Sequence, residues 1–414
     1  MPAALPSPAN PESVFTYAAP TLAFGKGAVA DIAWHLRAAR RVLVVTDPGV
    51  AATGAAQRVV DVLAHCSVTV WTDTEVEPTD ESLRRIGDSV RRMGRVDAFV
   101  AVGGGSSIDT AKAANLLSTN PGDLLDYVNA PIGGGAAPQQ PLKPLIAVPT
   151  TTGTGSESTT ICVLDVLDKH VKTGISHPRL RPTVAVVDPD LVMTQPRMVT
   201  ACAGMDIVCH ALESFTARPY DSFEAKAPAQ RVPYCGANPI SDTWALTALR
   251  LVADAFVPAV VTGDPEAMAT MALAATVAGL GFGNAGVHVP HANAYPIAGQ
   301  VRDYRPADYP AGKALVPHGM AVSLTAPAAF RALAPADPGR QQQAARILGA
   351  EDLPTALRNL MDAVGMPSGL AEVGVLEPDI PELVEGTLAQ QRLLALAPMS
   401  LDPDDLARIF RESL

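Results

Sequence analysis

The sequence predicts an α/β domain built on a mostly parallel sheet, followed by an all-helical domain. Short runs rich in β-branched residues alternate with Ala-rich helical stretches in the first half, and these runs stop near residue 195. Such alternation is typical of a parallel sheet covered by helices on both faces. The chain of 414 residues also exceeds the usual length of one domain. We therefore predict an α/β domain over residues 1–197 and a helical domain over residues 198–414.

Five segments have the composition of buried strands. They are RVLVVTD at 41–47, SVTVWTD at 67–73, DAFVAVG at 97–103, PLIAVPT at 144–150 and TVAVVDP at 183–189. Each of the first three is followed by a helical pattern, as expected for strand-helix units. The second half carries long Ala-, Leu- and Val-rich patterns, which predict helices, and two irregular segments at 217–242 and 299–319 interrupt them.

The composition narrows the class of protein. Acidic residues outnumber basic ones by 42 to 31 without any dense basic run, which argues against nucleic-acid binding. The N-terminus has neither the pattern of a secretory signal nor that of a transit peptide, and apolar stretches such as 271–283 look too short and Gly-broken to cross a bilayer. Five cysteines without a CxxC pair are typical of reduced thiols. We expect a soluble cytoplasmic protein with no membrane partner.

A glycine-rich turn joins the strand at 97–103 to the next helix. Gly103, Gly104 and Gly105 carry no Cβ, and Ser106 and Ser107 can cap the helix. The N–H groups exposed at this helix start would suit a pyrophosphate. Because the spacing is not that of GxGxxG, a simple strand-to-helix turn explains the same residues equally well.

A second polar turn follows the strand at 144–150. It carries hydroxyl groups on Thr150, Thr151, Thr152 and Thr154. Two such loops at the carboxyl ends of parallel strands would converge on one crevice, which is where open α/β sheets bind ligands.

Asp47 ends the strand at 41–47. Its carboxylate could accept hydrogen bonds from the 2′-hydroxyl of an adenosine ribose and would repel a 2′-phosphate, which favours NAD over NADP. A turn or a helix cap before Pro48 is an equal alternative.

The second half brings together residue types that bind transition metals. Asp206 and His210 lie four apart in a predicted helix and therefore share one face. His288 and His291 follow in the segment 286–299, and His318 precedes a further helical run. One carboxylate with imidazoles suits Fe(II) or Zn(II) rather than Mg²⁺ or Ca²⁺. Taken singly, each histidine is more typical of a core or capping residue than of a metal ligand.

Four ordered motifs resemble the iron-containing alcohol dehydrogenases. They are GGGSSIDTAK, PTTTGTGSE, GMDIVCHALESF and the pair VPH…PHG, within a match that begins at FGKGAV, 24–29. The resemblance implies a dehydroquinate synthase-like fold with NAD(H) and a divalent metal as cofactors, Fe(II) or alternatively Zn(II). The metal ligands of that family, one Asp and three His, fall on Asp206, His210, His291 and His318.

The same resemblance implies which residues surround the cofactor. They are Asp47, the loop 103–107, Asp109, Lys112, Thr150, Thr151, Thr154 and, in the run KTGI, Lys172.

The chain departs from the family pattern at one position. Many members have a second His four residues after the ligand that matches His291, and here that residue is Tyr295. Its hydroxyl could replace the His in proton exchange, or the ring could simply pack. His288, three residues before His291, and Tyr295 also occur in the subgroup of hydroxyacid-oxoacid transhydrogenases, which resembles this chain in GANPISD and in the insertion after residue 300. We assign His288 and Tyr295 as candidate catalytic residues.

The resemblance implies hydride transfer between NAD(H) and a small alcohol or hydroxyacid, with the metal as Lewis acid. The subgroup oxidises 4-hydroxybutyrate to succinic semialdehyde and passes the hydride to 2-oxoglutarate. A simple NAD-dependent alcohol dehydrogenase is the main alternative, and a dehydroquinate synthase-like lyase or a non-catalytic binder is more remote. We expect a homodimer or higher homo-oligomer.

A carboxylate substrate requires a cation. Four candidates lie in the two irregular segments: Arg218, Arg231, Arg302 and Lys313. Taken singly, each is more typical of a solvated surface charge.

Overall fold

The computed structural model describes residues 5–169, 171–231, 233–309 and 314–414. The chain divides into two compact units, one of Ala19–Gln195 and one that joins Pro196–Leu414 to the residues up to Ala18. The single boundary expected at 197/198 assigns the residues before Ala19 to the α/β domain, whereas the structure groups them with the helices. The hydrogen bond from Ala18 N to Asn284 Oδ1, 3.1 Å, is one of the contacts that hold this segment.

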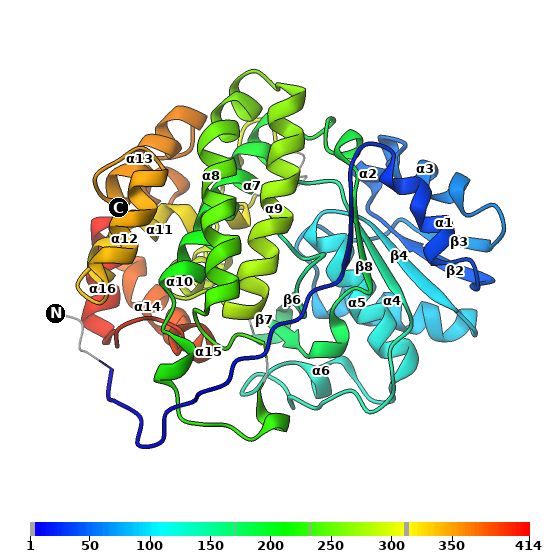
Figure 1. Ribbon diagram of the computed structural model, residues 1–414, viewed down its shortest axis with the longest axis horizontal. Coiled ribbons are helices and arrows are strands. Elements are labelled where there is room, and N and C mark those ends of the chain that lie inside the picture. The colour runs from blue at the N-terminus through cyan, green and yellow to red at the C-terminus, as the bar shows by residue number, and fades with distance from the viewer. Residues whose placement is uncertain (1–4, 170, 232, 310–313) are drawn as a thin grey trace. The chain divides into compact units, whose positions relative to one another are not determined.

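The α/β unit is built on a six-stranded parallel sheet with the order β1-β8-β5-β4-β2-β3. Figure 1 labels β2, β3, β4 and β8 of this sheet. The strands are β1 Thr21–Phe24, β2 Arg41–Val45, β3 Ser67–Trp71, β4 Ala98–Gly103, β5 Leu145–Pro149 and β8 Val184–Val187. Chain order reverses direction between β2 and β4, because β3 lies beyond β2 while β5 lies beyond β4. The carboxyl ends of β2 and β4 are therefore the switch point at which such sheets bind ligands.

Helices cover both faces of this sheet. They are α1 Ile32–His35, α2 Pro48–Ala52, α3 Ala55–Val62, α4 Asp80–Met93, α5 Gly105–Thr119 and α6 Leu124–Tyr127. One apolar core joins α1 and α3 to alternate residues of β2 and β4, and another joins α4 and α5 to the remaining residues of the same strands. Because successive strand residues point to opposite faces, continuous apolar strands of this kind are buried on both sides.

The edge strand and a hairpin of this unit were not predicted from the sequence. The edge strand β1 is only four residues long, and its Leu22 and Phe24 are partly exposed, so its composition gives a weak signal. The antiparallel hairpin of β6 Ile161–Val166 and β7 Val171–Ser176 lies outside the six-stranded sheet. Its charged residues Asp165 and Lys172 form an ion pair across the two strands, so the sequence here lacks the apolar pattern of a buried strand.

The described part of the second unit is helical, apart from isolated bridges. Its helices are α7 Arg197–Thr216, α8 Pro239–Val261, α9 Pro265–Ala285, α10 Val289–Gly299, α11 His318–Leu333, α12 Pro338–Ile347, α13 Leu353–Val364, α14 Ile380–Leu388, α15 Gln391–Leu394 and α16 Pro403–Glu412. The long helix α7 packs against α8, α9 and α11 and is buried over most of its length. The predicted fold class, a parallel α/β domain followed by a helical domain, is confirmed.

Three helices exceed the length expected for the apolar stretches. By length and composition alone α7, α8 and α9 could cross a membrane, so the prediction that these stretches are too short was wrong. The stretch 271–283 is part of α9, whose 21 residues tolerate its glycines. In the folded unit, 83% of the most apolar window of α7 and 78% of that of α9 are buried, because these helices form its core.

Candidate metal centre and cofactor loops

Helix α7 carries three polar side chains in its buried interior. Asp206, His210 and Glu213 are spaced four and three residues apart and therefore lie along one face of the helix. All three are nearly or fully buried. Burying a carboxylate is costly unless it is paired or binds a metal, so these residues need partners from neighbouring helices.

The start of α10 supplies one set of partners. Glu213 Oε1 accepts hydrogen bonds from the backbone N–H groups of His288, at 2.8 Å, and His291, at 3.2 Å. These donors belong to the first turn of the helix, where backbone N–H groups lack intrahelical partners. The carboxylate thereby fixes α10 against α7 and sets the direction of the His291 side chain.

The start of α11 approaches α7 equally closely. A Cβ at Gly319 would lie 2.0 Å from the carbonyl oxygen of Cys202, so only a glycine allows the two helices to meet at this point. His318, the preceding residue, is the first residue of α11. The close approach therefore brings its imidazole to the Asp206 carboxylate.

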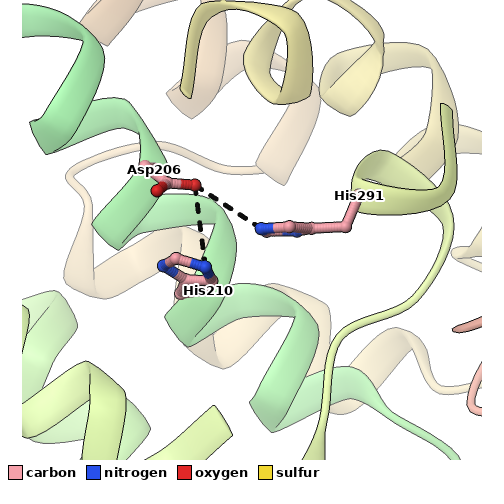
Figure 2. A group of neighbouring side chains, drawn as sticks. All are labelled: Asp206, His210 and His291. Carbon is pink, nitrogen blue, oxygen red and sulfur yellow. Dashed lines mark ion pairs between the residues drawn. The ribbon is translucent and has the colours of Figure 1, made fainter. Parts of the chain in front are cut away.

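Four side chains converge at this point. Figure 2 shows Asp206 and His210 on α7 and His291 on α10 directed toward one another. The Nε2 atoms of His210, His291 and His318 lie 3.7, 3.5 and 3.9 Å from Asp206 Oδ1. The side chain of His318 is 30% exposed, whereas those of the other three are at most 5% exposed, so the group is open on the His318 side.

These residues fit a divalent cation. Metal bonds of about 2.0–2.2 Å in a tetrahedral site place ligand atoms roughly 3.3–3.6 Å apart. The distances of 3.5–3.9 Å from Asp206 Oδ1 to the three imidazoles are close to this range, and the ligand atoms of Asp206, His210 and His291 all lie within 4.8 Å of one another. Asp206 Oδ1 and His291 Nε2 are buried and make no hydrogen bond within the described part of the chain. Buried polar atoms without partners require an explanation, and a shared cation provides one.

The electrostatics of the group favour the forms that bind metals. Burial alone would raise the pKa of Asp206, but the neighbouring imidazoles outweigh it and lower this pKa to about 2. Burial lowers the pKa of His210 to about 3, so its imidazole is neutral near pH 7. Burial would also lower the pKa of His291, yet Glu213 and Asp206 outweigh it and raise this pKa to about 9. A cation at Nε2 of His291 would take the place of that proton.

Glu213 is the residue that the sequence interpretation missed. Its Oε2 lies 2.5 Å from His291 Nδ1, the ring nitrogen opposite the one that faces Asp206. A carboxylate in this position orients a ligand imidazole and increases its basicity. The spacing Asp206, His210 and Glu213 on one helical face is a signal that could have revealed it.

We predict that Glu213→Gln weakens metal binding about 10- to 100-fold, the range found when such a supporting carboxylate is lost. Glutamine fills the same space, but it has only one oxygen. That oxygen cannot serve both the backbone N–H groups of α10 and the Nδ1–H of His291. Metal titration of the apoprotein measures the effect, with the exposed Glu266→Gln on α9 as control. Equal affinities for the two variants would contradict the supporting role.

His288 has a different environment from the one expected of a catalytic residue. Its Nδ1 accepts the N–H of Val289 at 2.8 Å and its Nε2 lies 3.1 Å from Thr216 Oγ1, so both ring nitrogens are engaged. The ring is fully buried, and burial lowers its pKa to about 4. These contacts make His288 the cap of α10, and we reinterpret it as a positioning residue.

Tyr295 lies near the open side of the group. Its ring centroid is 6.2 Å from that of His318, with the two planes inclined by 28°. The ring also packs against an apolar cluster that includes Phe282. Both interpretations of Tyr295, proton exchange and packing, are thus compatible with its position.

In the α/β unit, the two predicted loops contact each other. A Cβ on Gly104 would lie 3.2 Å from Thr151 Oγ1, and one on Gly105 would lie 3.0 Å from Thr154 Cγ2. Gly103 has φ of 154°, and a Cβ there would collide with the Ser107 side chain. These glycines permit the close approach of the loops.

The loops also fit a dinucleotide phosphate. The first turn of α5, a 15-residue helix, begins at Gly105 without any side-chain cap on its N–H groups. Thr150 Oγ1 is buried and makes no hydrogen bond within the described residues. Uncapped helix N–H groups and an unpartnered hydroxyl at the carboxyl end of the sheet are features that phosphate binding would satisfy.

Asp47 and the two serines have defined partners. Asp47 Oδ1 caps α2 by accepting the N–H of Val50 at 2.9 Å, and Oδ2 accepts a hydrogen bond from Ser107 Oγ at 3.2 Å. Ser106 Oγ accepts the N–H of Glu77 at 3.1 Å. The helix-capping alternative for Asp47 is therefore observed, and the carboxylate also links β2 to the glycine loop at the switch point.

Asp109 and Lys112 lie beneath the threonine loop rather than at its surface. Lys112 is fully buried, and its Nζ donates to Ser156 Oγ at 2.8 Å and to the Ile161 carbonyl at 2.6 Å. Asp109 accepts from Ser156 Oγ at 2.6 Å and pairs with Lys112 at 3.2 Å. Both side chains hold the loop, so any effect on the cofactor would pass through the loop, and their place around the cofactor stays a prediction.

The ammonium group of Lys172 also has acidic partners within the α/β unit. Its Nζ lies 2.7 Å from Glu77 Oε2 and 2.8 Å from Asp165 Oδ1. Burial would lower the pKa of this lysine, but the two carboxylates outweigh it and raise the pKa well above its usual value. Lys172 thus connects the hairpin to the loop that precedes α4.

The arginines expected to bind a substrate carboxylate have structural partners. Arg231 pairs with Glu12 at 3.1 Å, and Arg302 pairs with Asp379 at 2.7 Å. Arg218 donates from Nε to Ser222 Oγ at 2.9 Å and lies over the Phe223 ring. The fourth candidate, Lys313, lies outside the described residues. The ion pairs of Arg231 and Arg302 tie their segments to other parts of the helical unit, and a role of these arginines toward a substrate carboxylate stays a prediction.

Known proteins match this arrangement over nearly the whole chain. The family described as iron-containing alcohol dehydrogenase matches residues 19–189, and the C-terminal family of Fe-containing alcohol dehydrogenases matches residues 232–414. The mitochondrial hydroxyacid-oxoacid transhydrogenase of Bos taurus is 42% identical over 428 residues, covering 99% of this chain and 92% of the relative.

Solved structures extend the comparison. A 1,3-propanediol oxidoreductase superposes with a TM-score of 0.84 at 29% identity, over 97% of this chain and 100% of that one. The sulfoacetaldehyde reductase of Bifidobacterium kashiwanohense, solved with NAD⁺, gives a TM-score of 0.81 at 29% identity, over 96% of this chain and 98% of that one.

Fold and matches define the class of this protein, an oxidoreductase enzyme consistent with NAD-linked hydride transfer. Within that class, the chain belongs to the iron-containing alcohol dehydrogenase family. Membership implies a divalent metal and NAD as cofactors and a small alcohol as substrate. It favours an oxidoreductase over the lyase and the non-catalytic binder.

The expectation of a cytoplasmic protein was wrong. The curated relatives, including those of Bos taurus and Homo sapiens, are mitochondrial proteins. Composition could not distinguish the two compartments, because free cysteines indicate a reducing environment but not which compartment provides it.

Proposed function

We propose that this chain is a hydroxyacid-oxoacid transhydrogenase. The observation that carries the proposal is the 42% identity to the bovine enzyme of that name over 99% of this chain. In this reaction 4-hydroxybutyrate loses a hydride from its carbinol carbon and a proton from its hydroxyl group, which yields succinic semialdehyde. The hydride reduces NAD⁺, and the NADH formed passes it to the keto carbon of 2-oxoglutarate, whose oxygen takes up a proton.

Asp206, His210, His291 and His318 are the proposed ligands of a divalent cation, Fe(II) or alternatively Zn(II). The separations of 3.5–3.9 Å and the unpartnered atoms support this assignment. When bound, such a cation acts as a Lewis acid toward a substrate oxygen. The exposed side of His318 is where the substrate oxygen would enter.

The loop 103–107 with Thr150, Thr151 and Thr154 is proposed to hold the NAD(H) phosphates, and Asp47 the adenosine ribose. The uncapped α5 N-terminus orients the pyrophosphate, since its N–H groups and helix dipole favour a negative charge. Asp109, Lys112 and Lys172 position these loops from beneath. Tyr295 is the proposed proton donor and acceptor, which its stacking near His318 supports.

A decisive experiment uses 4-hydroxybutyrate that carries deuterium on C4, together with unlabelled 2-oxoglutarate and no added NAD. We predict that deuterium appears at C2 of the 2-hydroxyglutarate product and that a second dehydrogenase that consumes free NADH leaves the yield unchanged. This is the expected result when one bound NAD serves both half-reactions.

A simple NAD-dependent alcohol dehydrogenase is the second candidate, and the similarity to 1,3-propanediol oxidoreductase favours it. That enzyme type requires added NAD and loses its reducing equivalents to the NADH-consuming dehydrogenase. Absence of deuterium from 2-hydroxyglutarate, together with NAD-dependent oxidation of neutral alcohols, would replace the first proposal by the second.

A homodimer or higher homo-oligomer remains our proposal for the assembly, and light scattering tests it.

A further inference from the structure

Tyr234 occupies an unusual backbone conformation beside the metal centre. Its φ is 71°, a left-handed value that costs a non-glycine residue free energy unless the surroundings enforce it. The N–H groups of Tyr234 and Cys235 both donate to the Asn284 carbonyl, at 2.8 and 2.9 Å. A Cβ on Gly286 would lie 3.0 Å from the Tyr234 ring, so the bare glycine admits the aromatic side chain. The chain thus accepts local strain in order to place this ring.

The ring continues an aromatic wall that begins at a proposed metal ligand. The imidazole of His210 stacks on Phe282 with ring centroids 3.8 Å apart and planes inclined by 7°. Phe282 belongs to one apolar cluster with Tyr234, Tyr295 and Leu393. The wall therefore leads from the metal centre to α15 within the helical unit.

A guanidinium group lies at the far end of this wall. The Cζ atom of Arg392, on α15, is 4.8 Å from the centroid of the Tyr234 ring. The Arg392 side chain is exposed, and among the residues that the structure describes no carboxylate forms an ion pair with it. Arg231 and Arg302, by contrast, each have an acidic partner. Arg392 is a cation held in a fixed place but available to an external anion.

The two proposed substrates share the feature that such a cation would bind. In 4-hydroxybutyrate, two methylene groups separate the carbinol carbon from the carboxylate. In 2-oxoglutarate, two methylene groups separate the keto carbon from the distal carboxylate. With the reacting oxygen at the metal centre, both distal carboxylates would lie equally far from that oxygen, so one cation can serve both half-reactions.

The geometry points to Arg392 as the residue that binds the distal carboxylate of the hydroxyacid and of the oxoacid, with Tyr234 as its positioning residue. This inference rests on the proposed transhydrogenase function. It assigns the substrate class as acids whose carboxylate lies two methylene groups from the reacting carbon. A planar guanidinium suits this role because it can donate two parallel hydrogen bonds to a carboxylate.

The test compares Arg392→Gln with the wild type on an acid and on its neutral counterpart. For 4-hydroxybutyrate, kcat/KM is expected to fall about 10- to 100-fold, mostly through KM, because a charge-assisted pair is lost. For 1-butanol, which replaces the carboxylate by a methyl group, kcat/KM should stay within about threefold, since surface substitutions away from bound groups have small effects. Arg392→Lys keeps the charge and is expected to recover part of the loss.

Arg411→Gln, an exposed arginine on α16 that pairs with Glu377, is the matched control and should change neither activity. Inhibition by glutarate gives a second readout that needs no turnover, and its inhibition constant should rise in Arg392→Gln but not in the control. Equal losses on acid and alcohol, or unchanged glutarate inhibition, would overturn the assignment of Arg392. Failure of the wild type to exchange deuterium between hydroxyacid and oxoacid would instead overturn the proposed function.

Discussion

Asp206→Asn is expected to remove both the metal and the activity. Asn has the shape of Asp but no charge, and a neutral amide oxygen is a much weaker ligand for a divalent cation than a carboxylate. Lewis-acid stabilisation contributes several kcal/mol to such reactions, and a loss of about 4 kcal/mol corresponds to a roughly 1000-fold lower rate. We therefore predict a decrease in kcat of about that size.

Metal analysis and turnover, measured on the same anaerobic preparation, test this prediction together. The control is Asp254→Asn on the exposed side of α8, which should keep both the metal and the activity. Circular dichroism checks that the variant is folded. A folded Asp206→Asn protein with full metal content would show that the ion is held elsewhere, and one with full activity would remove Asp206 from the mechanism.

Hydrophobic periodicity in the sequence predicted the strands and helices whose buried residues follow a regular pattern. The continuous apolar strands and the Ala-rich helices of the α/β unit, and the shared helical face of Asp206 and His210, follow from local pattern. The convergence of His291 and His318 on Asp206 does not, because it depends on tertiary contacts such as that of Gly319 with Cys202. Only the family resemblance selected these histidines in advance.

Roles that depend on tertiary partners were assigned less well. His288 and His291 look alike in the sequence, yet their contacts with Glu213 differ. The His291 ring lies 2.5 Å from Glu213 Oε2, whereas His288 donates its backbone N–H to Oε1 and its ring lies 4.0 Å from that oxygen. The loop arginines looked available because their acidic partners lie far away in the chain, as Glu12 does from Arg231. A sequence pattern reports which face a residue occupies but not which group it meets there.

The role of Lys112 also depends on partners that the sequence does not reveal. Its replacement is expected to lower the stability of the α/β unit strongly. The ammonium group is fully buried and donates to Asp109, Ser156, Thr159 and Ile161. Lys112→Met leaves the Asp109 carboxylate buried without its cation, which typically costs about 3–5 kcal/mol. We predict a destabilisation of this size in the α/β unit, with faster hydrogen exchange in the segment 150–161.

A double variant identifies the cause. Asp109→Asn, added to Lys112→Met, removes the uncompensated charge. Its amide oxygen can still accept the N–H of Val163, and its amide nitrogen can donate to Ser156 Oγ, which no longer accepts from Lys112. It should therefore recover much of the stability, whereas the exposed Lys143→Met should cost almost none. If Lys112 instead contacted the cofactor, Lys112→Met would weaken NAD binding at unchanged stability, and the second substitution would restore nothing. Thermal unfolding and NAD titration of the same variants distinguish these cases, because a buried ion pair acts on the fold and a cofactor contact acts only on the affinity.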